Sequence, residues 1–383
     1  MSISEEIRET VKDWKNVTIG TIGSHTGKQI ASSAKRWGFK TLVVVEKGRE
    51  DLYTKFNNWL FDFVISVTHF RDILNEEIQS QLREKNVIWI PNRSFTFYVG
   101  PEEIRNKFRV PMFGSRDLLP TENRSYERGQ YYLLEKAGIP MPMTFSSPEK
   151  IDRLVIVKLQ QAKNPAERAD FYAVSPEDLY KEAGKRLKSG LINEEGLKKA
   201  RIEEYIIGPK FNANFHSHTL KDIFGDFAFL GFGDRIQTPL QGFLDLPAEV
   251  QLKLKKLETE IHVRNVEVGH RSNITMRESI QPIVYKSIEK FIRTCEVEYP
   301  PGIIGSASLQ GAVIESTEAG KKFEFVVFDV SPRVPGDPGI GPTSPEMPIL
   351  SLRYGVEIKD PLDLTMMEIK KALETNRPSE TVT

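Results

Sequence analysis

The stretch VIVKLQQAKNPAERADFYAV, residues 155–174, decides how the middle of this chain is expected to fold. It begins as an apolar strand that contains Lys158, continues into a polar loop and returns to apolar residues at Phe171. A lysine among Val, Ile and Leu is costly to bury without an anion. Two short strands around a loop, with an inward lysine, are typical of enzymes that cover a triphosphate. The alternative is that Lys158 faces solvent from an edge strand.

The loop between the two strands contains no glycine. Glycines in such loops let backbone N–H groups approach phosphate closely. Here Lys163 and Arg168 would reach phosphate with their side chains instead. We therefore expect the loop to cover a nucleotide by charge, and the alternative is a solvated, charged loop.

Composition limits the classes of function. The chain has 383 residues, with 53 basic and 53 acidic side chains and a formal net charge of zero, so no nucleic-acid partner is expected. Cys295 is the single cysteine, which excludes an intrachain disulfide and favours a reducing compartment. We see no signal peptide and no run near the ~20 apolar residues of a membrane helix. A cytoplasmic protein without a membrane partner is therefore expected.

The first ~120 residues alternate strand and helix. Strands are predicted at 16–23, 41–50, 61–67 and 86–91, with helices after the first and near 71–84. Apolar strands that alternate with helices predict a parallel, doubly wound sheet. Ligands bind such sheets beyond the carboxyl ends of the strands, where His25 and Ser94 are placed.

The rest of the chain mixes helices with strands. After a linker at 108–120, helices are predicted at 123–137 and 176–199, near 280–295 and at 362–375, with strands at 308–315 and 323–330. The tail from 376 is expected to be loose. Domain boundaries are predicted at 1–120, 121–200 and 201–383.

Two further segments suggest ligand contacts. GSHTGKQ (23–29) has three residues between its glycines and a Gln after the Lys, so it is not a Walker A loop, but the helix start that follows suits an anion near His25. A capped turn is the alternative. In RIEEYIIG (201–208), adjacent acids indicate either a solvated strand face or a hinge over a nucleotide.

Two strands near the end of the chain suggest a cation site. Asp329 is expected on the same strand face as Phe325 and Val327, and Gln310 lies on the preceding strand. Oxygen ligands on neighbouring strands, together with phosphate oxygens, suit Mg²⁺. The alternative is that Asp329 pairs with Arg333. His216 and His218 share a strand face and could bind a metal, but a lone pair without a cysteine pattern does not predict a zinc site.

Several segments together carry a resemblance to a known family. They are GSHTGKQIASSAKRWGFKTL (23–42), VIWIPNRSFTFYVG (87–100), VPMFGSRDLL (110–119), VIVKL (155–159), IEEYIIG (202–208), VGHRSNITMRESIQP (268–282), EYPPGIIGSASLQ (298–310) and FEFVVFDVSPRV (323–334). The set resembles the archaeal formate-dependent FAICAR synthetases, ATP-grasp ligases of purine biosynthesis. The resemblance implies an α/β chain with a Rossmann-like parallel-sheet N-terminal domain, followed by an ATP-grasp fold of two α+β subdomains.

The resemblance also implies a reaction and its residues. Formate would be joined to the amine of AICAR at the expense of ATP, with Mg²⁺ as cofactor and formyl phosphate as intermediate. Position by position, it implies nucleotide-substrate contacts at His25 and Ser94 and phosphate-facing arginines at Arg277 and Arg333. It implies ATP contacts at Lys158, Glu203, Glu204, Tyr205 and Ile206, and Mg²⁺ ligands at Gln310 and Asp329.

The chain departs from the family near several of these ligands. The loop after Lys158 lacks glycine, Asn92-Arg93 stands where the family has His-Gly, and Pro335-Gly336-Asp337 replaces Asp-Gly-Gly. His270 also stands where the family has Asn. These changes suggest a divergent paralogue branch, so an ATP-grasp ligase for another carboxylate and amine, or a nucleotide-binding partner subunit without catalysis, remain alternatives. The resemblance further implies a homo-oligomer of three or six chains.

Overall fold

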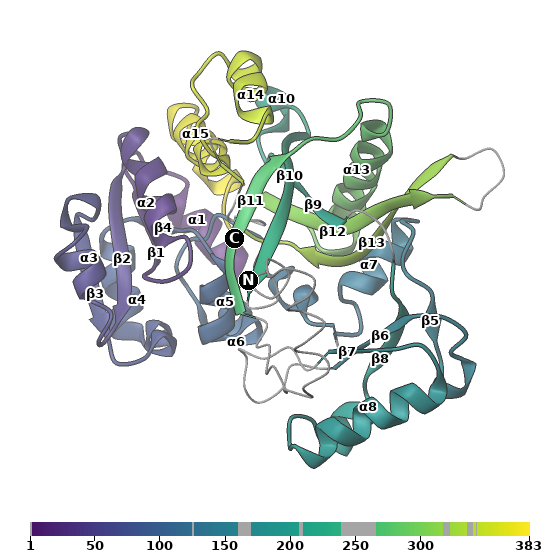
Figure 1. The fold of residues 1–383 in the computed structure, drawn as a ribbon. Helices are drawn as coiled ribbons and strands as arrows, with labels where there is room; N and C mark the ends of the chain where they lie inside the picture. Colours follow the sequence, from purple (N-terminus) through teal and green to yellow (C-terminus); the bar gives the residue numbers. More distant parts are fainter. Residues whose placement is uncertain are drawn as a thin grey trace.

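The computed structural model describes residues 2–124, 126–159, 170–206, 210–238, 266–316, 322–334, 340–341 and 343–383. Three sheets organise this part of the chain, as Figure 1 shows. A parallel sheet built from the N-terminal residues lies to one side of a five-stranded sheet, and a smaller sheet lies against the other end of it. No helix in the described ranges is long and apolar enough to cross a membrane.

The N-terminal sheet has the strand order β3-β2-β1-β4, and its neighbouring strands run parallel. Its strands are β1 (Thr18–Ile22), β2 (Lys40–Glu46), β3 (Phe63–Val67) and β4 (Val87–Trp89). Helices around it are α1 (Ile3–Val11), α2 (Gly27–Arg36), α3 (Asp51–Thr54), α4 (Glu76–Glu84), α5 (Arg93–Val99) and α6 (Pro101–Lys107). All five residues of β1 are buried, as expected for a central strand covered on both faces. The predicted parallel sheet is confirmed.

Helix boundaries differ from the prediction where the backbone leaves helical geometry. The predicted helix at 71–84 is a 3₁₀ turn, Phe70–Leu74, and then α4, because Asn75 between them is extended. The helix predicted at 176–199 is divided into α8 (Pro176–Lys188) and α9 (Glu194–Lys198). Gly190, with φ of 70°, adopts a left-handed conformation that a helix cannot continue.

The smaller sheet contains the opening stretch of sequence. Its order is β5-β8-β6-β7, with bounds β5 (Thr144–Phe145), β6 (Val155–Lys158), β7 (Phe171–Ala173) and β8 (Arg201–Glu204). β6 and β7 pair antiparallel, with Val155 opposite Ala173, so the predicted hairpin is confirmed. The alternating residues of β6 and β7 pack with α8 in one apolar cluster.

The five-stranded sheet has the order β11-β10-β9-β12-β13. Its strands are β9 (Lys210–Ser217), β10 (Phe227–Thr238), β11 (Val266–Ile274), β12 (Gly305–Glu315) and β13 (Phe323–Ser331). One face packs its aromatic and aliphatic side chains against α7 (Gln130–Lys136) and α13 (Gln281–Glu298), which forms the largest core cluster. Of the helix predicted at 123–137, only the α7 portion is helical. The remaining described α-helices are the one-turn α10 (Lys221–Phe224) and two longer helices, α14 (Glu346–Tyr354) and α15 (Pro361–Glu374).

The tail is packed, so the prediction of a loose tail is wrong. Thr383 and Met112 exchange two backbone hydrogen bonds of 3.0 and 3.2 Å. Val382 is fully buried beside α1 and α15. The Arg116 guanidinium donates to the Thr383 carbonyl, and burial lowers the pKa of Arg116 to about 10. The tail therefore forms part of the core that joins the N-terminal sheet to the rest of the chain.

Candidate active site between the two antiparallel sheets

Lys158 lies where the two antiparallel sheets meet. It ends β6, is 6% exposed, and places its Nζ 2.6 Å from Oε2 of Glu203 on the neighbouring strand. The same ammonium donates to the carbonyl of Phe328 in β13 at 3.0 Å. The alternative of a solvent-facing lysine is therefore wrong. A cation is held buried at the junction of the sheets, where the phosphates of a nucleotide would need one.

The acids of β8 have different surroundings. Glu203 is 1% exposed and binds both Lys158 and the Nε of Arg201, the latter at 2.5 Å. Glu204 is half-buried and pairs with Arg153 at 3.3 Å. The N–H groups of Glu204 and Tyr205 donate to backbone carbonyls, at 2.8 and 2.9 Å. The Glu203 carboxylate therefore forms an ion pair with Lys158. The predicted contact of Glu203 with a base or ribose stays untested.

A small apolar cluster bridges the two sheets beside Lys158. Ile206, which follows β8, packs with Ala312 and Val326 of the large sheet, and Phe328 lies at its edge. The Tyr205 ring stands edge-on to Tyr172 of β7 at 5.2 Å between centroids. Apolar side chains from both sheets next to a buried cation suit a flat base joined to phosphates.

Gln310 and Asp329 are directly opposite each other on β12 and β13. A β-bulge lies between this pair and the next, Gly311 with Val327, so that Phe328 has no opposite residue. The bulge shifts the alternation of side chains along β13. Phe325 and Val327 pack in the large core, whereas Asp329 faces Arg124, so the predicted shared face is wrong.

Arg124 is the cation that the sequence did not reveal. Its two terminal nitrogens lie 3.5 Å from Oδ2 of Asp329 and 3.5 Å from Oδ2 of Asp170. Burial alone would lower the pKa of the Arg124 guanidinium, but these two carboxylates raise it above its ordinary value. Arg124 lies at the start of the helix predicted at 123–137, and no residue type in ENRSYERG (122–129) marks it as the partner of these carboxylates.

Asp170 also connects the two residues that flank the loop after Lys158. Its Oδ1 accepts a hydrogen bond of 3.1 Å from the backbone N–H of Leu159, which joins the two ends of the loop. Lys163 and Arg168 lie within 160–169, outside the described residues, so their predicted contacts with phosphate stay predictions.

The two predicted arginines differ in position. Arg333 is 5% exposed and binds Glu122 through two hydrogen bonds of 2.6 and 3.0 Å. The alternative pairing of Asp329 with Arg333 is therefore wrong. Arg277 is exposed in the turn before α13, and no contact in the described ranges joins its side chain to Lys158 or Asp329. Its predicted role at the phosphates stays untested.

A second site lies at the carboxyl edge of the parallel sheet. A cavity of about 570 Å³ is lined by residues 23–29 and by residues of 48–53, including His25 and Arg49. α2 begins at this cavity, so its first N–H groups and Arg49 suit an anion. Asn92 donates to the His25 carbonyl at 2.9 Å and caps α5, whose first turn contains the buried Ser94. The structure thus brings the His25 and Ser94 segments together.

Strands β9 and β12 of the large sheet share a buried polar face, which extends from Gln310, at the junction of the two antiparallel sheets, to His216. On β9 and β12, Asn212, Asn214 and His216 stand opposite Gln310, Ser308 and Ser306, respectively. All six are at most 8% exposed, and the opposite face of both strands is apolar. Within the described residues, Asn214 Oδ1 and Ser308 Oγ have no hydrogen-bond partner. Buried polar atoms of this kind suit a ligand. The alternation in KFNANFHSH was the signal that could have indicated the face.

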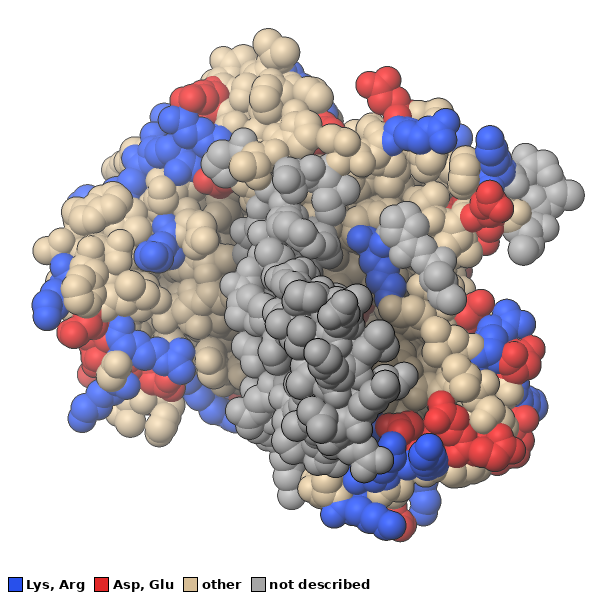
Figure 2. Space-filling view, in the orientation of Figure 1, with Lys and Arg blue, Asp and Glu red and all other residues tan. Residues whose placement is uncertain are grey.

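Surface charge is mixed over the described part of the face in Figure 2. Basic and acidic side chains lie interspersed, most clearly over the smaller sheet and α8. This distribution agrees with a net charge of zero.

Comparisons with known proteins place the chain among purine-biosynthesis ligases. Residues 19–145 match a family described as protein of unknown function (DUF1246), and residues 178–383 match a domain of unknown function (DUF1297). A 5-formaminoimidazole-4-carboxamide-1-(beta)-D-ribofuranosyl 5'-monophosphate synthetase from Methanopyrus kandleri is 36% identical over 92% of this chain and 91% of its own length. The protein of the same name from Methanocaldococcus jannaschii is 37% identical over 84% of this chain and 83% of its own length.

Solved structures show the same fold. An IMP biosynthesis protein PurP from Thermococcus kodakaraensis has a TM-score of 0.66 and 24% identity, and the match covers 95% of this chain and all of that one. An ADP complex of purK, an N5-carboxyaminoimidazole ribonucleotide synthetase, has a TM-score of 0.53 and 12% identity over 83% of this chain and 70% of that chain. The expected ATP-grasp fold behind a parallel-sheet domain is confirmed.

Proposed function

Because the chain belongs to the family of the 5-formaminoimidazole-4-carboxamide ribonucleotide (FAICAR) synthetases, we propose that it joins formate to the amine of AICAR with cleavage of ATP. One observation carries the proposal. A buried lysine, a half-buried arginine and a cross-strand pair of oxygen-bearing side chains, Gln310 and Asp329, gather where the two antiparallel sheets meet. That arrangement suits the phosphates of ATP, since phosphoryl transfer depends on positioning and on neutralising charge.

The proposed reaction has two steps. A formate oxygen attacks the terminal phosphorus of ATP, which yields formyl phosphate and ADP. The AICAR amine then attacks the formyl carbon, phosphate leaves with the bonding electrons, and the nitrogen loses a proton. Lys158 and Arg124 would neutralise charge on the phosphates, and exclusion of water from the bound site would protect the acyl phosphate from hydrolysis.

Mg²⁺ fits the donor set at this junction. Asp329 supplies a carboxylate and Gln310 an amide oxygen from directly opposite positions, and hard oxygen ligands are what Mg²⁺ prefers. When bound, the ion would neutralise charge on phosphate oxygens. Asp329 would then be shared between the ion and Arg124, which lies 3.5 Å away.

The AICAR phosphate is assigned to the cavity at the start of α2. The helix N-terminus, Arg49 and Lys28 line it and would bind a phosphate. His25 and Ser94 lie in the two segments that Asn92 joins there. His25→Ala should therefore raise the KM for AICAR and leave the KM for ATP near that of the wild type.

The test is an assay of ADP release with ATP, Mg²⁺, formate and AICAR. Steady-state ADP release should require formate and should be strongly stimulated by AICAR, which consumes the formyl phosphate. Lys158→Met should abolish it, whereas Lys150→Met, which changes an exposed lysine of the same subdomain, should not. Equal rates with and without AICAR would contradict the proposal.

Two observations keep another pair of carboxylate and amine substrates as an alternative. The phosphate-covering loop has no glycine, and Asn92 is committed to capping α5 and to holding His25. A panel of carboxylates, each with and without AICAR, separates the cases. Release with another acid favours the alternative ligase, and ATP binding without release from any acid favours a non-catalytic partner. The trimer or hexamer stays a prediction for analytical ultracentrifugation.

A further inference from the structure

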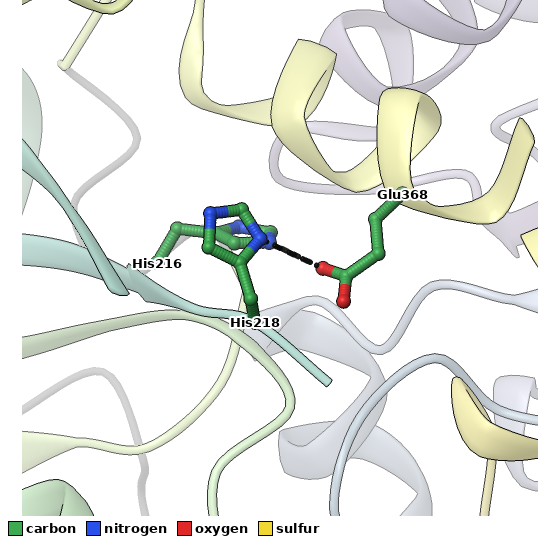
Figure 3. Close-up of side chains that lie close together, drawn as sticks. All are labelled: His216, His218 and Glu368. Carbon is green, nitrogen blue, oxygen red and sulfur yellow. Dashed lines mark hydrogen bonds and ion pairs between the residues drawn. The ribbon is translucent and has the colours of Figure 1, made fainter. Parts of the chain in front are cut away.

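Three buried side chains meet on the polar face of the large sheet, where β9 ends beside α15. Figure 3 shows that His216 and His218, from β9 and the residue just beyond it, point toward Glu368 of α15. All three side chains are 0% exposed. His216 and Glu368 are 152 residues apart in the sequence.

The ligand-type atoms of the three residues are close together. Oε2 of Glu368 lies 3.1 Å from Nε2 of His216 and 3.2 Å from Nδ1 of His218, and all three atoms lie within 4.8 Å of one another. Metal bonds of ~2.0–2.1 Å at a tetrahedral angle separate ligand atoms by about 3.3 Å. Two of the three spacings therefore fit a bound ion already, and the third closes with a shift of at most about 1.5 Å.

Each of the three residues is also held from its far side. Nδ1 of His216 lies 3.2 Å from the Ser306 hydroxyl, and Nε2 of His218 lies 2.9 Å from the Tyr354 hydroxyl. The second oxygen of Glu368 accepts from the backbone and side chain of Thr219 and from the Leu220 N–H. Outer partners of this kind orient the ligands of metal sites.

The hydrogen-bond network closes with or without an ion. Without one, both imidazoles donate to Glu368 while the two hydroxyls donate to the imidazoles. With one, both imidazoles turn their lone pairs to the ion and donate to the same hydroxyls, which also accept. The described partners of Glu368 are imidazoles, a hydroxyl and backbone N–H groups, so a divalent ion would supply the charge that a buried carboxylate requires.

We propose that His216, His218 and Glu368 bind one divalent cation of the Zn²⁺ class. Two imidazoles and one carboxylate are a ligand set for zinc with a fourth position for water. His218 and Thr219 form part of the wall of a cavity of about 600 Å³, which provides a route for the ion and for that water. The ion ties α15 to the large sheet and is separate from the Mg²⁺ proposed at Asp329.

The test uses the full chain after treatment with a chelator. Zn²⁺ is titrated by calorimetry in the presence of excess Mg²⁺, which disfavours imidazole ligands. We expect one equivalent of Zn²⁺, a rise in Tm on binding, and the visible absorption of tetrahedral Co²⁺ when Co²⁺ is used instead. Failure of the wild type to bind stoichiometric Zn²⁺ overturns the proposal.

Variants locate the ion. Glu368→Gln keeps the shape of the side chain and an acceptor oxygen for Thr219 and Leu220, and its amide N–H groups can donate to the two imidazoles in their other tautomer. The variant should therefore fold yet lose Zn²⁺ binding. His69→Ala, a change at an exposed histidine, is the control and should bind as the wild type does. Should Glu368→Gln fail to fold, Ser306→Ala and Tyr354→Phe remove only outer partners and should weaken binding about 10- to 100-fold. Wild-type affinity in Glu368→Gln, or in both outer variants, contradicts the site.

Discussion

The buried ion pair of Lys158 and Glu203 provides the sharpest test of the site. Lys158→Met keeps the length of the side chain but removes its charge, so that the Phe328 carbonyl and Oε2 of Glu203 lose their cation. Breaking a buried pair costs ~3–5 kcal/mol when the remaining charge has no other partner. Glu203 keeps Arg201, whose side chain is 35% exposed, so we expect a loss of about 2–3 kcal/mol in the free energy of unfolding.

A second substitution separates stability from ATP binding. In Lys158→Met/Glu203→Gln the leftover charge is also removed, so the double variant should recover about 1–2 kcal/mol relative to Lys158→Met alone. ATP binding should be lost in both variants, since neither has the ammonium. Adding Glu203→Gln to Lys158→Met should therefore restore part of the free energy of unfolding without restoring ATP binding.

Urea denaturation of the four proteins of this cycle measures the coupling, and calorimetry measures ATP binding. Additive stability effects, with a coupling within ~0.5 kcal/mol, would show that the ion pair does not contribute as the geometry indicates. ATP affinity at the wild-type level in Lys158→Met would refute the assignment of the nucleotide site.

Two substitutions and one labelling experiment test other parts of the structure. Asp329→Asn should weaken Mg²⁺-dependent ADP release by at least about 10-fold at limiting Mg²⁺, which a Mg²⁺ titration of the rate will measure. Val382→Ala, in the packed tail, should lower the free energy of unfolding by about 1–2 kcal/mol, and an unchanged urea midpoint would indicate a loose tail. Burial raises the pKa of the Cys295 thiol, so thiol reagents should label it slowly at pH 8 in the native protein and fast in denaturant. The unfolded chain releases that proton above pH ~8.5 while the folded one keeps it, so this thiol should make stability fall as pH rises beyond that value.

Part of the site could be predicted because it depends on local patterns. Lys158 within VIVKL identified an inward lysine, and Gln310 and Asp329 on adjacent strands identified a pair of oxygen ligands. The pair is real, but the face of Asp329 was predicted wrongly. A bulge inserts one residue at Phe328, and no residue type in FEFVVFDV indicates a bulge.

The amino-acid sequence by itself determined the layers of this protein. Alternation of apolar strands with helices predicts the parallel sheet, and the strand–loop–strand around Lys158 predicts the hairpin, because periodicity records which face of each element is buried.

Only the tertiary structure decided how distant charges pair. Arg124 meets Asp329, Glu122 meets Arg333, and Glu368 meets His216, each from segments that lie far apart along the chain. Buried charges need partners, but any of 53 acidic and 53 basic side chains can supply one, and packing of the three sheets selects which. Local sequence patterns therefore could not predict Arg124 and Glu368, which complete the two proposed sites.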